Sequence, residues 1–370
     1  MEKNILQKIK KAGLIGRGGA CFPVWEKWSA VYNELLKKPV KERKCYVICN
    51  ASEGEPDVKK DRHILKKFPE TVLKGMMAAV DFLGARQGYI YLNSQYYREI
   101  APRLEKIIGD YAIEVLEKPH KAGYIGGEES AILNAIEGKK IEPRLKPPFP
   151  FSKGLFGQPT LTNNVETFYN VGRLLLASYE PNRFITITEH FPKSYLGTVI
   201  RLKNFVKKEV FLFPEDWSVK KILKASGRWP LYKFFVQVGG GASGIILNSN
   251  QLNSPVQGSG SISIFSLERH DPIELIRGWA NFFQMESCGK CTPCREGTYR
   301  LKLELQNENP NWEIARELLD NLSEASFCGL GCAAPIAITG YFKNVFPLIS
   351  GKDSGFSGEQ VKAVCECFSE

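Results

Sequence analysis

Cysteine is the residue type with the most distinctive spacing in this chain of 370 residues. Cys288, Cys291 and Cys294 stand at strict three-residue steps in the segment ESCGKCTPCREG. Thiolates are soft ligands, and a C-x2-C-x2-C spacing lets three sulfurs converge on one iron–sulfur cluster while backbone N–H groups between them face the sulfides. A zinc site typically gathers four cysteines as two C-x2-C pairs. The uninterrupted ladder therefore favours an iron–sulfur cluster over zinc.

A four-iron cluster needs a fourth ligand, which the ladder does not supply. The rest of the chain offers Cys328 and Cys332 in SFCGLGCAAP, and Cys365 and Cys367 in VCECF. Turn-forming glycines around the first pair suit a ligand presented by a loop between helices. We predict Cys328 as the fourth ligand, with Cys332 as the alternative.

A glycine-rich segment near the N-terminus, LIGRGGACFP at residues 14–23, can bring backbone close to a ligand. Gly16, Gly18 and Gly19 carry no Cβ, and exposed N–H groups beside Arg17 could cradle a phosphate. The segment matches neither the dinucleotide fingerprint nor a Walker loop. Taken alone, it favours a plain turn.

Three further segments combine polar side chains with turn-forming residues: CNASEGEPDVKKDR at 49–62, YIGGEES at 124–130 and RLKPPFPFSKGLFGQPTLTNNVETF at 144–168. Asn and Glu side chains at strand ends are well placed to bind a ring system and a ribose. The same carboxylates also fit a solvated surface or the starts of helices. Together with the glycine segment, these loops favour a ligand site.

Hydrophobic patterns divide the chain into three regions. In residues 1–190, the strand-like runs CYVICNA and GYIYLN flank the helix-like DRHILKKFPETVLKGMMAAVDFLG, which predicts an α/β domain. Residues 191–268 contain short strands, among them SYLGTVIRLK, KEVFLFPE, KFFVQVGGG and SISIFSLE, and a single helix, SVKKILKASG. Residues 269–370 are helical in pattern, so we expect a helical bundle to carry the cysteine ladder.

Composition indicates the compartment of the protein and the kinds of ligand and partner that it binds. No segment approaches the roughly 18 apolar residues of a membrane-spanning helix, and the N-terminus lacks a signal-peptide pattern, so we expect a cytoplasmic protein. In that compartment, close-set cysteines favour metal binding over disulfides. The net charge of +10 comes from scattered lysines and arginines. It favours a solvated surface, an acidic protein partner or anionic cofactors over nucleic acid.

In wording and in order, these segments resemble the flavin-bearing, NADH-binding subunit of respiratory NADH:quinone oxidoreductase. The same subunit type occurs in NAD-linked hydrogenases and formate dehydrogenases. The similarity runs from about residue 12 to about residue 340 through GRGGACFP, CNASEGEP, YIGGEES, PRLKPPFP with GLFGQPTLTNNVET, and ESCGKCTPCREG. It implies a Rossmann-like FMN-binding α/β domain, a ubiquitin-like, soluble-ligand-binding β-grasp domain and a helical bundle holding one 4Fe-4S cluster.

The implied activity is that of an NADH dehydrogenase subunit. Electrons would pass from NADH via FMN to the cluster, because a flavin can take up a hydride and release single electrons. The implied partners are a thioredoxin-like 2Fe-2S subunit and further iron–sulfur subunits of a hydrogenase, a formate dehydrogenase or a respiratory complex. Such a subunit would be cytoplasmic or peripheral to a membrane complex, without inserting into the membrane.

The resemblance also implies site residues. The flavin phosphate loop would be Gly16, Arg17, Gly18 and Gly19. Flavin contacts would be Lys27, Asn50, Glu53, Tyr124, Gly127, Glu128, Glu129, Asn163, Asn164 and Thr167. The NADH side would be Phe22, Glu55, Glu129 and Phe149. The catalytic set would be Glu55, Glu129 and Lys27, and the cluster ligands would be Cys288, Cys291, Cys294 and Cys328.

Some positions depart from the family pattern. Ser52 replaces an aspartate, Cys21 a glycine and Trp25 a small residue, and Ala30 stands where an aromatic ring is usual, with Tyr32 as a possible substitute. These changes remove a carboxylate and make one edge of the pocket bulkier. They leave open an alternative function, a flavin and iron–sulfur electron-transfer module that takes its electrons from a different donor.

Overall fold

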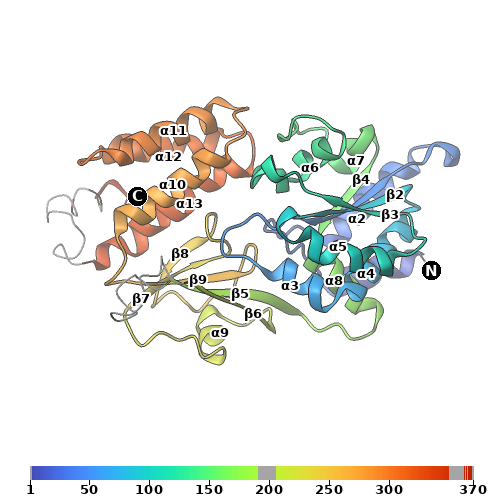
Figure 1. Ribbon diagram of the computed structural model, residues 1–370, viewed down its shortest axis with the longest axis horizontal. Helices are drawn as coiled ribbons and strands as arrows, with labels where there is room; N and C mark the ends of the chain where they lie inside the picture. Colours follow the sequence, from blue (N-terminus) through green and yellow to red (C-terminus); the bar gives the residue numbers. More distant parts are fainter. Residues whose placement is uncertain (1, 191–205, 350–361, 363, 365, 369–370) are drawn as a thin grey trace. The chain divides into compact units, whose positions relative to one another are not determined.

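The computed structural model describes residues 2–190, 206–349, 362, 364 and 366–368 (Figure 1). The chain divides into two compact units. The first unit consists of Met1–Gly54 and Lys59–Asn182, and the second of Glu55–Val58 and Arg183–Glu370. Two sequence predictions, the strand SYLGTVIRLK and the ligand candidate Cys365, lie outside the described residues.

The first unit is built on a four-stranded parallel sheet with the strand order β3-β2-β1-β4. The strands are β1 (Tyr46–Ala51), β2 (Gln87–Leu92), β3 (Ile113–Glu117) and β4 (Thr160–Asn164). All but one residue of β1 are buried, as expected for a central strand covered on both faces. In the register of β1 with β4, Asn50 is the partner of Asn164. The ends of these two strands therefore lie side by side.

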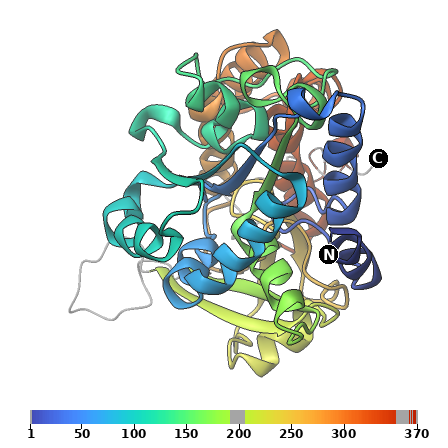
Figure 2. The same cartoon turned by 90° about the vertical axis from the view of Figure 1, so that its right-hand side faces the viewer.

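Helices cover both faces of this sheet (Figure 2). On one face, Ile132 and Leu133 of α6 pack with Tyr46 and Ile48 of β1. The helices of the first unit are α1 (Glu2–Lys11), α2 (Val24–Leu36), α3 (Lys60–Lys67), α4 (Pro69–Leu83), α5 (Ser94–Ile108), α6 (Glu129–Ile136), α7 (Pro150–Lys153) and α8 (Val165–Leu175). Short 3-10 turns are η1 (Val40–Glu42), η2 (His120–Ala122), η3 (Ile125–Gly127) and η4 (Leu155–Gly157). The layers confirm the predicted Rossmann-like α/β fold.

Helices α4 and α8 pack unusually closely through two glycines. A Cβ on Gly75 would lie 1.9 Å from the Phe168 carbonyl oxygen, and a Cβ on Gly172 would lie 2.0 Å from the Thr71 carbonyl oxygen. At each glycine, the backbone of the opposite helix therefore occupies the space that a side chain would need. Because α8 begins directly after β4, this contact also fixes where the end of β4 lies.

The second unit contains a five-stranded mixed sheet with the strand order β6-β5-β9-β7-β8. Its strands are β5 (Asn182–His190), β6 (Val206–Pro214), β7 (Phe234–Val238), β8 (Ile245–Asn248) and β9 (Ser261–Ser266). β9 runs parallel to β5 and antiparallel to β7. Helix α9 (Val219–Ala225) packs its apolar side chains onto one face of the sheet. The sheet is thus formed by two strands, a helix and three further strands, with the last strand, β9, in the centre. This connectivity confirms the predicted β-grasp fold.

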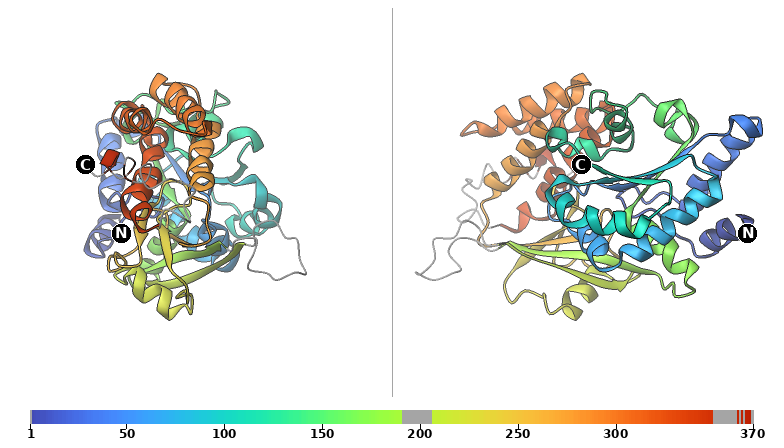
Figure 3. Two further views of the ribbon diagram at one scale, coloured as in Figure 1. Left: turned by 90° about the vertical axis from the view of Figure 1, so that its left-hand side faces the viewer. Right: turned by 45° about the vertical axis from the view of Figure 1, so that its right-hand side comes forward.

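After β9, the described residues of the second unit are mainly helical, as the sequence predicted (orange to red in Figure 3). It comprises α10 (Pro272–Glu286), α11 (Thr292–Gln306), α12 (Trp312–Ala325), α13 (Gly329–Asn344) and the 3-10 turn η5 (Phe346–Leu348). Asp271 caps α10 and Asn311 caps α12 through side-chain hydrogen bonds. The first residues of α11 and α13 instead follow Cys291 and Cys328, which make no such bond. Among the described residues, no helix is both long and apolar enough to cross a membrane.

Candidate functional site

The glycine-rich segment of residues 14–23 forms a loop closed at its base. Ile15 forms a bridge with Pro23, and the N–H of Gly16 donates to the carbonyl of Phe22 at 2.8 Å. Gly19 has a φ of +118°, which residues with a side chain rarely adopt. The loop is thus a backbone turn held at both ends, immediately before α2.

The loop rests on the N-terminus of α8. The backbone N–H of Arg17 donates to the Thr167 hydroxyl at 3.0 Å, and Arg17 is 2% exposed. A Cβ on Gly18 would lie 3.3 Å from Cβ of Asn164, so only a small residue keeps this approach. The structure therefore brings together four predicted flavin residues from segments 150 positions apart.

The ends of β1 and β4 contribute amides to the same region. Asn50 donates to the carbonyl of Gly127 at 3.0 Å, which joins segment 124–130 to the end of β1. The Asn163 oxygen is best oriented to accept from the Trp28 indole N–H at 2.8 Å. Asn164 accepts from the N–H of Glu166 and caps α8. In a parallel sheet, such strand ends are where ligands bind.

Segment 124–130 packs tightly against the loop after β1. A Cβ on Gly127 would lie 2.5 Å from the Ser52 hydroxyl, and a Cβ on Gly54 would lie 3.3 Å from Tyr124. Glycine at both positions therefore allows the two loops to touch. Ser52, which replaces the expected aspartate, fills this contact and donates to the Asn50 side-chain oxygen at 2.7 Å.

Two carboxylates mark the start of α6. Glu128 is its N-cap and accepts from the N–H groups of Ser130 and Ala131 at 2.8 and 2.9 Å. Burial opposes ionisation, but hydrogen bonds from Lys146 and Ser130 hold the pKa of Glu128 below its usual value. Glu129 forms an ion pair with Lys27 of α2 at 2.7 Å, and each side chain is about one quarter exposed. Lys27 and Glu129, two of the three predicted catalytic residues, are thus neighbours.

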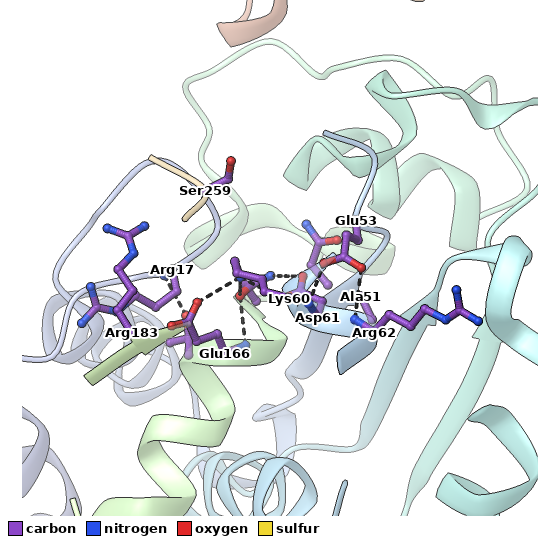
Figure 4. A network of polar contacts seen from close by, with 12 residues as sticks. Arg17, Ala51, Glu53, Lys60, Asp61, Arg62, Glu166, Arg183 and Ser259 are labelled. Atoms are coloured by element: carbon purple, nitrogen blue, oxygen red, sulfur yellow. Dashed lines mark hydrogen bonds and ion pairs between the residues drawn. The ribbon is translucent and has the colours of Figure 1, made fainter. Parts of the chain in front are cut away.

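A buried charge network lies directly beneath these strand ends (Figure 4). The Lys60 ammonium is 2.7 Å from Asp61 and 3.1 Å from Glu166. The Asn164 amide donates to Asp61 at 2.6 Å and its oxygen accepts from Lys60 at 3.2 Å. Lys60, Asp61 and Glu166 are all at most 3% exposed. One buried cation therefore balances two buried carboxylates, and Asn164 links them to the cap of α8.

Glu53 caps the first turn of α3 from the preceding loop (Figure 4). Its two carboxylate oxygens accept from the N–H groups of Asp61 and Arg62 at 2.5 and 3.1 Å. Burial of the carboxyl group, reinforced by the negative charge of Asp61, raises the pKa of Glu53 to about 8. A predicted flavin contact is therefore a carboxyl group that holds its proton near neutral pH.

Two predicted aromatic residues are accessible for stacking. Phe22 is 52% exposed and Phe149 is 46% exposed. Phe149 stacks on Phe151 with ring centroids 5.7 Å apart. Large apolar rings left at the surface beside polar loops often contact a ligand.

The bulky residues that depart from the family pattern have other partners. Lys10 of α1 lies over the Trp25 ring, 4.3 Å from its centroid. Tyr32 stacks on Phe82 of α4 at 5.2 Å, so its ring does not replace the aromatic expected near Ala30. Cys21 has a φ of +51° and its thiol donates to the Gly19 carbonyl. The side chains of Trp25 and Tyr32 therefore pack against neighbouring helices.

Glu55 is the one predicted nucleotide residue that belongs to the second unit. Its oxygen Oε1 accepts from the N–H of Ala242 at 3.0 Å, the N–H of Ser243 at 3.0 Å and the Ser243 hydroxyl at 3.1 Å. Sequence reasoning did not find these partners. The one sequence feature that could have indicated a binding loop for this carboxylate is the glycine-rich run GGGASG between β7 and β8.

The predicted cluster ligands gather at two helix N-termini of the second unit. Cys291 precedes α11, Cys294 lies in its first turn, and Cys328 precedes α13. Burial raises the pKa of the Cys294 thiol to about 11, and the charges of Cys291, Cys328 and Cys288 add to the shift, which places all four side chains in one neighbourhood. The positive ends of two helix dipoles suit thiolates and a negatively charged cluster. The donor set thus fits an iron–sulfur cluster.

A single metal ion does not fit these side chains. Within the described part of the chain, no three His, Cys, Asp or Glu residues are grouped closely enough to hold one ion. A four-iron cube spaces its thiolates more widely than one tetrahedral ion does. Cys332 lies one turn further into α13 and donates to the Ser326 carbonyl, while Cys367 donates to the Trp312 carbonyl.

Fold and site together define a flavin-binding α/β domain joined to a β-grasp sheet and a helical iron–sulfur region. The family model described as "Nuo51 FMN-binding domain" matches residues 9–173, and that described as "NADH-ubiquinone oxidoreductase-F iron-sulfur binding region" matches residues 274–347. The chain belongs to the family of F-type subunits of NADH-quinone oxidoreductase.

The relatives cover most of the chain. The F-type subunit of NADH-quinone oxidoreductase from Aquifex aeolicus (strain VF5) is 32% identical over 90% of this chain and 82% of its own length. The protein of the same name from Rickettsia rickettsii (strain Sheila Smith) is 32% identical over 95% and 90%. A crystal structure of an NAD+-reducing [NiFe]-hydrogenase in the H2-reduced state superposes with a TM-score of 0.79 and 28% identity, over 98% of this chain. This chain spans 62% of the length of that hydrogenase chain.

Proposed function

We propose that this protein is the NADH-oxidising flavoprotein subunit of a larger redox complex. It takes electrons from NADH, passes them through FMN to a 4Fe-4S cluster and delivers them to partner subunits. The observation that carries this proposal is the assembly at the ends of β1 and β4, where the glycine loop, Asn50, Asn164 and Gly127 meet. Family membership supports it independently.

The first unit supplies what FMN needs. Backbone N–H groups of Gly18 and Gly19, with the cations of Arg17 and Lys27, suit its phosphate, while the N–H of Gly16 closes the base of the loop. Amides and carboxyls of segments 50–53, 124–129 and 163–167 suit its polar ring edge and ribityl chain. Bound FMN supplies the conversion of a two-electron hydride into single electrons.

Several residues suit NADH. The half-exposed rings of Phe22 and Phe149 can stack on its bases. Glu129 and Glu55 can accept hydrogen bonds from ribose hydroxyls, and their negative charge disfavours the additional phosphate of NADPH. The ion pair with Lys27 keeps Glu129 oriented. The protein's own residues thus bind and orient the nucleotide and exclude water, without a nucleophile or a strong base.

Cys288, Cys291, Cys294 and Cys328 would hold the cluster. The Cys332 thiol donates to the Ser326 carbonyl, which supports Cys328 over Cys332 as the fourth ligand. The domain boundaries that we propose are 1–190 for FMN and NADH, 191–268 for the β-grasp domain and 269–370 for the iron–sulfur domain.

The proposed acceptors are a thioredoxin-like 2Fe-2S subunit and further iron–sulfur subunits, in the cytoplasm or at the periphery of a membrane complex. The net charge of +10 suits an acidic neighbour.

An anaerobic absorbance titration tests the proposal. The iron-reconstituted protein with FMN is titrated first with NADPH and then with NADH. We expect NADH alone to bleach the flavin band. A normal flavin and cluster spectrum that neither nucleotide changes would refute NADH oxidation and favour the alternative, an electron-transfer module with another donor.

A further inference from the structure

A four-residue segment, Glu55–Val58, belongs to the β-grasp unit although the chain on both sides of it belongs to the first unit. The segment directly follows the loop that carries Ser52 and Glu53. It contains Glu55, the carboxylate that we propose for the nucleotide. Its contacts therefore determine how that carboxylate is presented.

The loop Gly239–Gly244, between β7 and β8, holds the Glu55 carboxylate. Three donors converge on Oε1: the backbone N–H groups of Ala242 and Ser243 and the Ser243 hydroxyl, all within 3.1 Å. A Cβ on Gly240 would lie 2.3 Å from the same oxygen. The loop thus forms a nest of backbone N–H groups that binds a carboxylate. The Glu55 carboxylate fits there only because residue 240 is a glycine.

The residues after Glu55 are fixed to the same sheet. The N–H of Gly241 donates to the Pro56 carbonyl at 2.9 Å. Asp57 lies 2.7 Å from His190 on β5 and 2.7 Å from Lys208 on β6, and accepts from Ser263 on β9 at 2.9 Å. Three strands therefore hold one carboxylate two residues after Glu55. The segment has little freedom to move along the sheet.

We propose that the loop Gly239–Gly244 is a positioning element for the nucleotide: it orients the Glu55 carboxylate and thereby sets the affinity for NADH. This inference rests on the proposed function, in which Glu55 binds NADH. The physical basis is preorganisation. A glutamate held by three donors loses no side-chain freedom when a ribose hydroxyl binds, whereas an unrestrained glutamate does. The loop would in this way act on the nucleotide through the carboxylate that it holds.

Two substitutions in the loop test the inference. Ser243→Ala removes one donor and should weaken NAD+ binding to the oxidised protein about fivefold, the worth of one hydrogen bond. Gly240→Ala places a methyl group against Oε1 and should weaken binding about as much as Glu55→Gln does. Gly278→Ala is the matched control, because a Cβ at Gly278 meets nothing within 4 Å. Binding is measured by calorimetry with NAD+, and FMN content by absorbance.

The decisive comparison repeats Ser243→Ala in a Glu55→Ala background. If the loop acts through Glu55, the substitution has no further effect there. In steady-state assays, most of the loss should fall on KM for NADH, with FMN content equal to that of the wild type.

Two results would overturn the inference alone: unchanged NAD+ affinity in both loop variants, or the full Ser243→Ala effect without Glu55. If the wild-type protein neither binds NAD+ nor is reduced by NADH, the proposed function fails as well. The wild-type measurement therefore separates the two failures.

Discussion

The hydroxyl oxygen of Ser287 lies 3.3 Å from the sulfur of Cys294. Ser287 directly precedes Cys288, so the contact joins the end of α10 to the first turn of α11. Once Cys294 is a cluster ligand, its thiolate can accept a hydrogen bond from this hydroxyl. Hydrogen bonds to cluster sulfurs stabilise the more negative, reduced state and raise the reduction potential.

Ser287→Ala should therefore lower the reduction potential of the cluster without loss of iron. One hydrogen bond of about 1 kcal/mol corresponds to roughly 40 mV for a one-electron couple. The potential is measured by a redox titration followed by electron paramagnetic resonance. Ser323→Ala, an exposed position on α12, is the control. An unchanged potential in Ser287→Ala would show that the hydroxyl does not reach the bound thiolate.

The fourth cluster ligand can be identified by two parallel substitutions. Cys328→Ser should reduce iron and sulfide content and abolish the cluster spectrum, because Cys328 shares the neighbourhood of Cys294. Cys332→Ser should retain the cluster, because the Cys332 thiol is turned to the Ser326 carbonyl. Iron analysis after anaerobic reconstitution distinguishes the two. The reverse pattern would assign Cys332 as the ligand.

Lys60→Met should strongly destabilise the protein. It leaves Asp61 and Glu166 buried without their cation, and breaking a buried pair in this way typically costs about 3–5 kcal/mol. Lys66→Met, on the same helix, removes an exposed ion pair with Glu99 and should cost less than about 1 kcal/mol. Urea unfolding of both variants measures the difference. Equal losses would mean that Lys60 carries no special energetic role.

The free energy of unfolding should depend on pH through Glu53. In the unfolded chain its pKa is near 4.5, and in the folded protein it is about 8. Between these values the folded state binds the additional proton, so stability falls as pH rises from about 4.5 to about 8 and then levels off. Burial raises the pKa of the neighbouring Asp61 too, which acts in the same direction.

Glu53→Gln should flatten this dependence, since a glutamine keeps the shape and cannot ionise. Melting temperatures at several pH values between 5 and 8 test it. Glu70→Gln is a suitable control because Glu70 is a surface residue whose pKa is lowered, by its own backbone N–H and by Arg103. A wild-type profile that rises with pH over this range would contradict the assignment.

Patterns in the sequence were enough to find the cysteine ladder and the strands β1 and β2. The strand β4, whose end carries Asn163 and Asn164, was not among the strands read from the pattern. Cys288, Cys291 and Cys294 are close in sequence, so their convergence depends on one turn and one helix. The fourth ligand, Cys328, stays a prediction, because its approach to the ladder depends on the packing of α13 against α11, which a local pattern does not encode. The β-grasp fold was predicted, although the strand β5 was not among the strands read from the pattern.

Contacts between residues far apart in the sequence could not be predicted from it. The Lys60 network depends on Asn164, 104 positions away, and Glu55 is held by Ser243, 188 positions away. No periodicity links such residues, and a single lysine in KKDR looks like a solvated charge. The helix boundaries were also predicted only in part. The pattern from Asp61 to Gly84 forms two helices, because Pro69 cannot continue α3 and instead begins α4.

The assignment of Glu55–Val58 to the second unit has a consequence for fragments of the protein. The chain leaves the first unit, enters the second for four residues, returns, and enters it again at Arg183. No single cut separates two complete units. A fragment beginning at Arg183 would lack Asp57 and leave His190 and Lys208 without their carboxylate. Such a fragment should be rescued only when a peptide spanning this segment is added in trans.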